Sequence, residues 1–202
     1  MIAAEPILDT YVQAIREALA AGEALEPTLE RIADAMRPLL ADRQWLAARG
    51  LPKPGEPRYY LLYEDPDQGF VVTLMHHGAG HRGWIHDHGS MWTVYGVYEG
   101  QEVIARYERV DDGSREGYAE IRPTVRLDAG PGTVDCVLPY AIHNEVNETD
   151  APSLAIIVRS ENGGRVLQSR FDPERRTTWQ GPGLPATPEG NPTRNRLGPR
   201  PS

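Results

Sequence analysis

The first 50 residues show the spacing of amphipathic helices. Apolar side chains recur every three or four positions in two stretches, which is the period of one face of an α-helix. Pro6 stands near the start of the first stretch and Gly22 just after its end, as is usual at helix boundaries. The second stretch begins near residues 26–27, and Pro38 is expected to kink or divide it. A short third piece around Trp45 completes a predicted helical cap.

Between residues 58 and 160 the pattern changes to short runs rich in β-branched and aromatic residues. Turn-forming sequences at 65–69 and 111–113 separate neighbouring runs. Seven or more strands with no helix between them predict an antiparallel sandwich or barrel. The runs are RYYLLYE, GFVVTLMHH, WTVYGVYEG, EVIARYERV, YAEIRPTVRL, GTVDCVLPY and SLAIIVRS.

The C-terminal stretch differs again. Residues 179–202 are dense in Pro, Gly, Asn and Arg and show no periodicity, so we expect an extended tail, with a strap across the barrel as the alternative. After the glycine pair at 163–164, residues 165–170 are expected to form a helix with a solvated face. The predicted organisation is a helical cap at 1–50, a β-barrel at 51–178 and a Pro/Gly-rich tail at 179–202.

Composition and charge narrow the possible partners. The 202 residues are 40% hydrophobic and 25% charged, as in ordinary soluble proteins. A formal charge of −8 argues against nucleic acid as a partner, and no stretch approaches the roughly 20 apolar residues that span a bilayer. The single cysteine, Cys136, excludes an internal disulfide and fits a reducing cytoplasm. We therefore expect a cytoplasmic monomer or homodimer that acts on a small molecule.

Three histidines are the candidate metal ligands. His86 and His88 are two residues apart, so on a strand both imidazoles point to the same face and can share one ion. His143 follows Pro139 in a second β segment, and a barrel can bring it to the first two. Three neutral nitrogens with open coordination positions suit Fe, Zn, Cu or Ni.

The frame around these histidines resembles that of the cupins. Gly80, His86, His88 and Gly100 have the spacing of the first cupin motif, and the segment 132–147 approximates the second. Between residues 59 and 172 the chain further resembles the cysteine dioxygenase family of thiol dioxygenases, through LYEDPDQGFVV, IHDHGSMW and GVYEG. This resemblance implies a cupin jelly-roll barrel, mostly β with N-terminal helices. It also implies an Fe(II) ion held by three histidines, which adds O2 to a thiolate to give a sulfinate.

Several positions depart from the pattern of this family. Thr93 stands where most cupins have a glutamate ligand, as expected for a three-histidine site. Tyr60 occupies the place of the arginine that binds the substrate carboxylate, and Arg58 is the nearby substitute. The Ser-x-His-x-Tyr triad of the family keeps its serine as Ser153 but has Ala155 and Ile157 in the other two places.

Other side chains can supply what these positions lack. Arg159 shares the strand parity of Ser153 and can hold a carboxylate through two hydrogen bonds. Tyr95 and Tyr98 follow the histidine pair and are the candidate phenols near the metal, with core packing as the alternative. The substrate-binding candidates are thus Tyr60, Arg58, Arg159 and Thr93.

The sequence therefore predicts an Fe(II)-dependent oxidoreductase, a thiol dioxygenase-like enzyme whose substrates are O2 and a small organic thiol. Two alternatives stay open. One is a metal-holding cupin that binds a small molecule as a sensor without turnover, which the missing triad favours. The other is a cupin enzyme with another metal and a non-thiol substrate.

Overall fold

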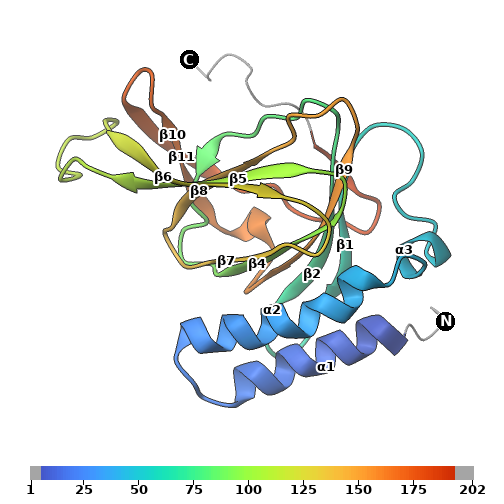
Figure 1. Cartoon of the computed structure of the whole chain (residues 1–202). Helices are drawn as coiled ribbons and strands as arrows, with labels where there is room; N and C mark the ends of the chain where they lie inside the picture. Colours follow the sequence, from blue (N-terminus) through green and yellow to red (C-terminus); the bar gives the residue numbers. More distant parts are fainter. Residues whose placement is uncertain (1–5, 194–202) are drawn as a thin grey trace.

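A computed structural model describes residues 6–193, beginning with three helices. They are α1 (Pro6–Ala20), α2 (Leu25–Ala41) and α3 (Trp45–Ala48). The first two lie side by side along one side of the barrel (Figure 1). Pro38 lies in the last turn of α2 and does not divide it.

The rest of the chain is built from antiparallel strands in two six-stranded sheets. The first sheet has the order β12-β1-β2-β9-β4-β7, and the second has the order β11-β10-β3-β8-β5-β6. Their bounds are β1 (Arg58–Glu64), β2 (Val71–His77), β3 (Ile85–His86), β4 (Thr93–Glu99), β5 (Glu102–Arg109), β6 (Ile121–Ala129), β7 (Val134–Val137), β8 (Ile142–Val146), β9 (Ser153–Arg159), β10 (Leu167–Asp172), β11 (Thr177–Pro182) and β12 (Asn191–Pro192).

The connections between strands define a jelly roll. From β2 to β5 and again from β7 to β10, each successive strand lies in the sheet opposite to the one before it. Every strand pair is antiparallel, and the two sheets face each other across the interior. The predicted fold class, a mostly β jelly-roll barrel with N-terminal helices, is confirmed.

The first sheet has a buried core on each of its faces. On β9, Leu154, Ile156 and Val158 pack toward the helices, while Ala155 and Ile157 face the barrel interior. Burial on both faces explains why this strand is apolar throughout instead of alternating with polar residues. On β4, a Cβ at Gly96 would collide with Met36 and Leu40, so glycine lets α2 approach the sheet closely.

The C-terminal segment is part of the barrel. Residues 165–170, which were expected to be helical, instead form the end of a 3-10 turn (Gly163–Arg165) and strand β10, so that prediction was wrong. Beyond β11 the chain runs back over the first sheet. Leu61 donates its backbone N–H to Thr187 O, and Asn162 exchanges two hydrogen bonds with Ala186. Residues 194–202 of the predicted tail lie outside the described residues.

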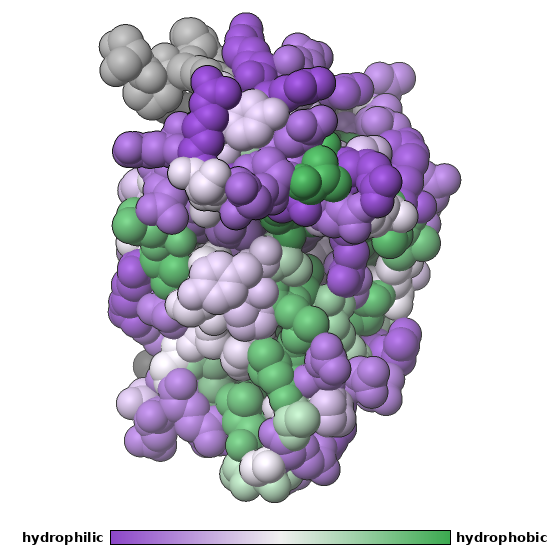
Figure 2. Space-filling view, turned by 90° about the vertical axis from the view of Figure 1, so that its left-hand side faces the viewer, coloured by the Kyte–Doolittle hydropathy of each residue, from purple (hydrophilic) through white to green (hydrophobic). Residues whose placement is uncertain are grey.

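The surface is unevenly polar. On the face that is seen from the left of Figure 1, hydrophilic side chains cover the upper part and hydrophobic ones gather in the lower part, at the level of the helices (Figure 2). Within residues 6–193, no helix is both long enough and apolar enough to cross a membrane.

Asp65 joins the helical cap to the barrel. Its buried carboxylate accepts hydrogen bonds from Arg16 Nε of α1 at 2.8 Å, from Tyr63 Oη at 3.1 Å and from the backbone N–H groups of Asp67 and Gln68. Burial alone would raise the pKa of Asp65, but these hydrogen bonds lower it to about 2. The charged carboxylate is therefore the form that the folded chain stabilises.

We expect Asp65→Asn to lower the free energy of unfolding at pH 7 by about 1–3 kcal/mol, because several donors lose a charged acceptor. Since the pKa is lowered on folding, this stabilisation is present above about pH 4 and is lost as the pH falls toward 2. Urea unfolding of both proteins between pH 7 and pH 3 measures it. Asp34→Asn, which removes an exposed helical ion pair with Arg37, is the matched control. A difference that stays constant with pH would contradict this role for Asp65.

Candidate metal centre

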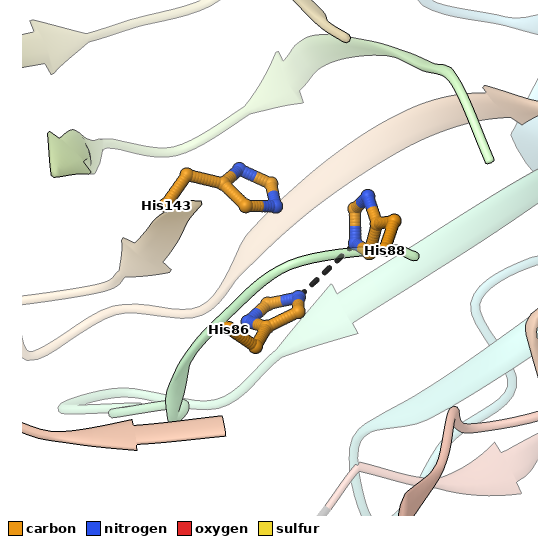
Figure 3. Close-up of side chains that lie close together, drawn as sticks. All are labelled: His86, His88 and His143. Carbon is orange, nitrogen blue, oxygen red and sulfur yellow. Dashed lines mark hydrogen bonds between the residues drawn. The ribbon is translucent and has the colours of Figure 1, made fainter. Parts of the chain in front are cut away.

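Two neighbouring strands bring the three histidines together. His86 ends β3, His88 follows two residues later, and His143 lies on β8 directly opposite His86 in the antiparallel register. Their imidazoles point toward one another (Figure 3). One nitrogen from each ring lies within 4.8 Å of the other two. This cluster can hold a metal ion.

The loop that carries His88 is held in place from both sides. The Asp87 side chain points away from the histidines and accepts the backbone N–H groups of Gly89 and Ser169, at 3.0 and 2.8 Å. Gly89 has a φ of 56°, and a Cβ there would come within 2.7 Å of Leu167 O. The loop therefore requires glycine at this position, and β10 fixes the direction of His88.

The protons on two of the histidines can be assigned from their partners. His86 Nδ1 lies 2.9 Å from Trp84 O, and because a carbonyl only accepts, this nitrogen carries the proton. His88 Nε2 lies 3.3 Å from Arg159 Nη2, and because a guanidinium only donates, this nitrogen carries the lone pair. His88 Nδ1 then donates to Thr93 Oγ1 at 2.9 Å. Both Nε2 atoms are thus acceptors.

The two acceptors face each other with no proton between them. His86 Nε2 and His88 Nε2 are 3.0 Å apart. Burial first, and then the neighbouring His143, lower the pKa of His86 to about 4. Burial and Arg159 lower the pKa of His88 well below its usual value. Both rings are therefore neutral at physiological pH, so the facing lone pairs repel unless a cation lies between them.

A metal ion satisfies this arrangement. Metal–imidazole bonds are about 2.0–2.1 Å long, so two Nε2 atoms 3.0 Å apart are close enough to share one ion. His143 is fully buried, yet neither of its ring nitrogens has a partner in hydrogen-bond geometry. If one of these His143 nitrogens is the third ligand of the same ion, its lack of a hydrogen-bond partner is explained. The residues present thus fit a three-histidine metal centre.

Glu145 stands behind the third histidine. Its Oε1 lies 3.1 Å from His143 Nδ1. Burial by itself would raise the pKa of Glu145, but the His143 imidazole beside it holds the pKa of this carboxyl well below its usual range. A carboxylate next to Nδ1 favours the tautomer whose Nε2 is free to bind metal.

A pocket opens onto His86. Its wall combines apolar side chains with charged and polar ones, and β2, β4, β9 and the segment after β11 (183–193, the C-terminal strap) all contribute to it. The lining residues are Met75, His77, His81, Gly83, Trp84, His86, Tyr95, Glu145, Ile157, Arg159, Gln168, Arg170, Leu184 and Thr193.

Arg159 brings a buried positive charge to this pocket. Its guanidinium donates to Tyr59 Oη at 2.9 Å and to His88 Nε2 at 3.3 Å, and it lies over the Tyr59 ring. The side chain is buried, but its Nε has no hydrogen-bond partner. No carboxylate of the described chain pairs with it at ion-pair distance. Such an uncompensated cation favours an anionic ligand in the pocket.

The remaining candidate residues divide into two groups. Thr93 contacts His88, and Tyr95 lines the pocket. Tyr60 and Tyr98 instead pack into the core between the sheet and the helices, where Tyr98 Oη donates to Asp42 O at 2.7 Å. Arg58 donates to Gly190 O of the C-terminal strap and to Glu56. The structure thus does not bring Tyr60, Arg58 or Tyr98 to the histidines.

Two acidic residues near the site were given no role from the sequence. Glu145 follows His143 by two residues, so its place on the same strand face was the available signal. Glu102 is the first residue of β5 and is buried, where it contacts His77, Tyr95 and Ser153. Glu102 follows the Gly100-Gln101 turn, where a strand end is usually exposed. The sequence therefore gave no sign that this carboxylate is buried near the site.

Comparison with known proteins finds solved structures that are similar at low sequence identity. No protein-family model matches the chain, and no curated protein matches it. It is similar to a solved protein of Thermus thermophilus, with 19% identity and a TM-score of 0.40, over 53% of this chain and 85% of that one. A cupin-superfamily sugar phosphate isomerase from Silicibacter pomeroyi is similar with 19% identity and a TM-score of 0.35. The match covers 56% of this chain and 68% of that one.

A third similar structure is oxalate oxidase in complex with the substrate analogue glycolate. It has 12% identity and a TM-score of 0.40, over 55% of this chain and 53% of that one. The similar structures thus include cupin-superfamily proteins, and this chain spans about half of the oxidase. At these identities the likeness concerns the fold alone and says nothing about the reaction.

We expect His88→Ala to abolish the stabilisation of the protein by added divalent metal. In the wild type, Co(II) or Zn(II) relieves the repulsion between the two Nε2 atoms and raises the melting temperature by several degrees. Thermal unfolding of metal-free protein with and without metal measures this shift. His76→Ala removes a histidine outside the cluster and should keep the full shift. An equal shift in the wild type and in His88→Ala would contradict the assigned site.

Proposed function

We propose that the protein is an Fe(II)-dependent thiol dioxygenase-like oxidoreductase that acts on a small organic thiol. The observation that carries the proposal is the set of three imidazoles, His86, His88 and His143, which converge without a carboxylate ligand beside an open pocket. A ferrous ion held there would offer adjacent free positions to a thiolate and to O2. The balanced reaction is RSH + O2 → RSO2H, in which sulfur is oxidised and both oxygen atoms end on it.

The side chains around the histidines have separate tasks in this proposal. Thr93 fixes the tautomer and the ring orientation of His88 through its hydrogen bond to Nδ1. Arg159 attracts an anionic group of the substrate and orients it beside the histidines. Met75, Ile157 and Leu184 give the pocket apolar walls, which exclude water from the carbon chain of the substrate.

The decisive experiment is oxygen uptake by protein purified without oxygen and loaded with Fe(II). Wild type should consume O2 in the presence of at least one compound in a panel of mercapto-acids and aminothiols, and should yield the sulfinate. Mass spectrometry after reaction with ¹⁸O2 should find two labelled oxygen atoms in the product. His88→Ala, which lacks a ligand, is the control for free iron in solution. No thiol-dependent uptake across the panel would refute the proposal.

Ile157 in the pocket wall favours a second candidate function. At this position the resemblance implied a tyrosine, and the apolar replacement cannot carry a proton. A metal-holding protein that binds a small molecule without turnover would show stabilisation by the ligand and no oxygen uptake. A third possibility is an enzyme that uses another metal and a non-thiol substrate. Metal analysis of the native protein tests it, because stoichiometric Zn or Ni in place of Fe points to a different reaction.

We expect Arg159→Gln to weaken the apparent binding of anionic thiols by about 10- to 100-fold, since a charged hydrogen bond contributes about 1.5–3 kcal/mol. Neutral thiols of the same size should lose far less. Apparent affinities of Fe(II)- or Co(II)-loaded protein for 3-mercaptopropionate and for 1-butanethiol measure the difference. Arg170→Gln, a second pocket arginine, tests whether any positive charge at the pocket is sufficient. Equal losses for both thiols in Arg159→Gln would show that the arginine acts only on the histidine site.

A further inference from the structure

A second group of buried polar side chains lies beside the pocket and is independent of the three histidines. It centres on Glu102 of β5, whose side chain is fully shielded from solvent. Three donors from three other strands converge on this carboxylate: His77 of β2, Tyr95 of β4 and Ser153 of β9. We call these four residues the Glu102 cluster. Two of them, His77 and Tyr95, also line the pocket.

The geometry of the cluster divides the carboxylate between its donors. Glu102 Oε1 accepts Ser153 Oγ at 2.6 Å and His77 Nδ1 at 3.2 Å. Oε2 is left to a single donor, the Tyr95 hydroxyl, in a short contact. The His77 ring also stacks on His81, with 4.2 Å between centroids and 8° between planes. The cluster is therefore a fixed assembly whose members restrain one another.

A buried carboxylate is costly unless its hydrogen-bonding capacity is used. Burial by itself would raise the pKa of Glu102, but His77 and the hydrogen bonds from Ser153 and Tyr95 hold it below its usual value. For Tyr95, burial first and the Glu102 charge second raise the pKa well above its usual value. The carboxylate is thus charged and only accepts, whereas the phenol keeps its proton and donates it.

This assignment fixes how Tyr95 can meet a ligand. A phenol has one proton, and in this protein it is directed to Glu102 Oε2. The oxygen therefore offers only lone pairs to any other neighbour. The Tyr95 hydroxyl also interacts electrostatically with Glu145 and Arg159, both of which line the same pocket. The pocket thus presents donors at Arg159 and an acceptor at Tyr95.

We propose that Glu102 is a positioning residue that orients the Tyr95 phenol as a hydrogen-bond acceptor in the ligand pocket, which selects ligands with an O–H or N–H donor near the metal-binding group. This inference rests on the proposed function in one respect only, namely that the ligand binds the metal through sulfur. The orientation of Tyr95 by Glu102 does not depend on it. Each part has its own measurement.

The first measurement uses metal-free protein and tests the orientation alone. Tyrosines are replaced by 3-fluorotyrosine, and the ¹⁹F resonance of Tyr95 is identified as the one missing from Tyr95→Phe. Glu102→Gln should shift this resonance, because a neutral amide is a weaker acceptor than a carboxylate. Glu108→Gln makes the same chemical change on the same strand, at a partly exposed residue paired with Arg122, and should leave the resonance in place.

The second measurement tests selection with two uncharged thiols of equal size, 2-mercaptoethanol and 1-propanethiol, which differ by one hydroxyl group. Their affinities for Co(II)-substituted protein are followed through the cobalt–thiolate absorption. In Tyr95→Phe the dissociation constant of 2-mercaptoethanol, relative to that of 1-propanethiol, should be about 3- to 10-fold higher than in the wild type. This is the size expected for the loss of one hydrogen bond. Glu102→Gln should change this ratio in the same direction, and Glu108→Gln should not change it.

The outcomes separate the two proposals. A Tyr95 resonance that is identical in wild type and Glu102→Gln overturns the positioning role of Glu102. An unchanged affinity ratio in Tyr95→Phe overturns the selection of donor-bearing ligands. If no thiol produces a cobalt–thiolate band, the proposed function fails with thiols, while the fluorine spectra still decide the role of Glu102. Tyr95→Phe keeps the ring and its packing, so it supports the test even where Glu102→Gln folds poorly.

Discussion

The site depends on one electrostatic constraint: two lone pairs that face each other across 3.0 Å, on His86 Nε2 and His88 Nε2. Trp84 O accepts the proton of His86 Nδ1, and Arg159 donates to His88 Nε2, so neither Nε2 can become the donor without losing a hydrogen bond. Burial opposes the addition of a second proton to either ring. Arg159 already donates to His88 Nε2, and a cation between the two nitrogens would remove the remaining repulsion. The two rings are thus arranged so that they can share a metal ion.

Much of this centre follows from the period of a β-strand. Residues two apart on a strand share a face, which predicts the pairing of His86 with His88 and places Arg159 on the interior side of its strand. In the structure β3 ends at His86, and the following loop brings His88 to the same cluster. The third histidine required long-range information, because the register of β8 against β3 sets His143 opposite His86. Spacing along the chain does not encode that register. The resemblance to the cupin motifs supplied it.

The placement of Tyr60 and Arg58 shows where the same reasoning fails. A shift of one residue along a strand moves a side chain to the other face of the sheet. Tyr60 faces the helices, whereas its neighbour Tyr59 faces the interior and accepts the hydrogen bond from Arg159. In the first sheet both faces are apolar, since the helices cover one of them. The hydrophobic pattern of β1 therefore cannot show which tyrosine points inward.

Glu102 illustrates a harder limit, because its environment is assembled from four strands. No local pattern marks a carboxylate that becomes buried only when β2, β4 and β9 each contribute one donor. In the register of the sheet, Tyr95 of β4 stands directly opposite Ile157 of β9, and His77 of β2 stands opposite Ser153. Tyr95 thus carries a polar group beside Ile157, and His77 carries one beside Ser153, whereas Met75 and Val97, the neighbours of Ala155, are apolar. A pocket can keep its hydrogen-bonding character while the residues of one strand change, provided that adjacent strands in register supply equivalent atoms.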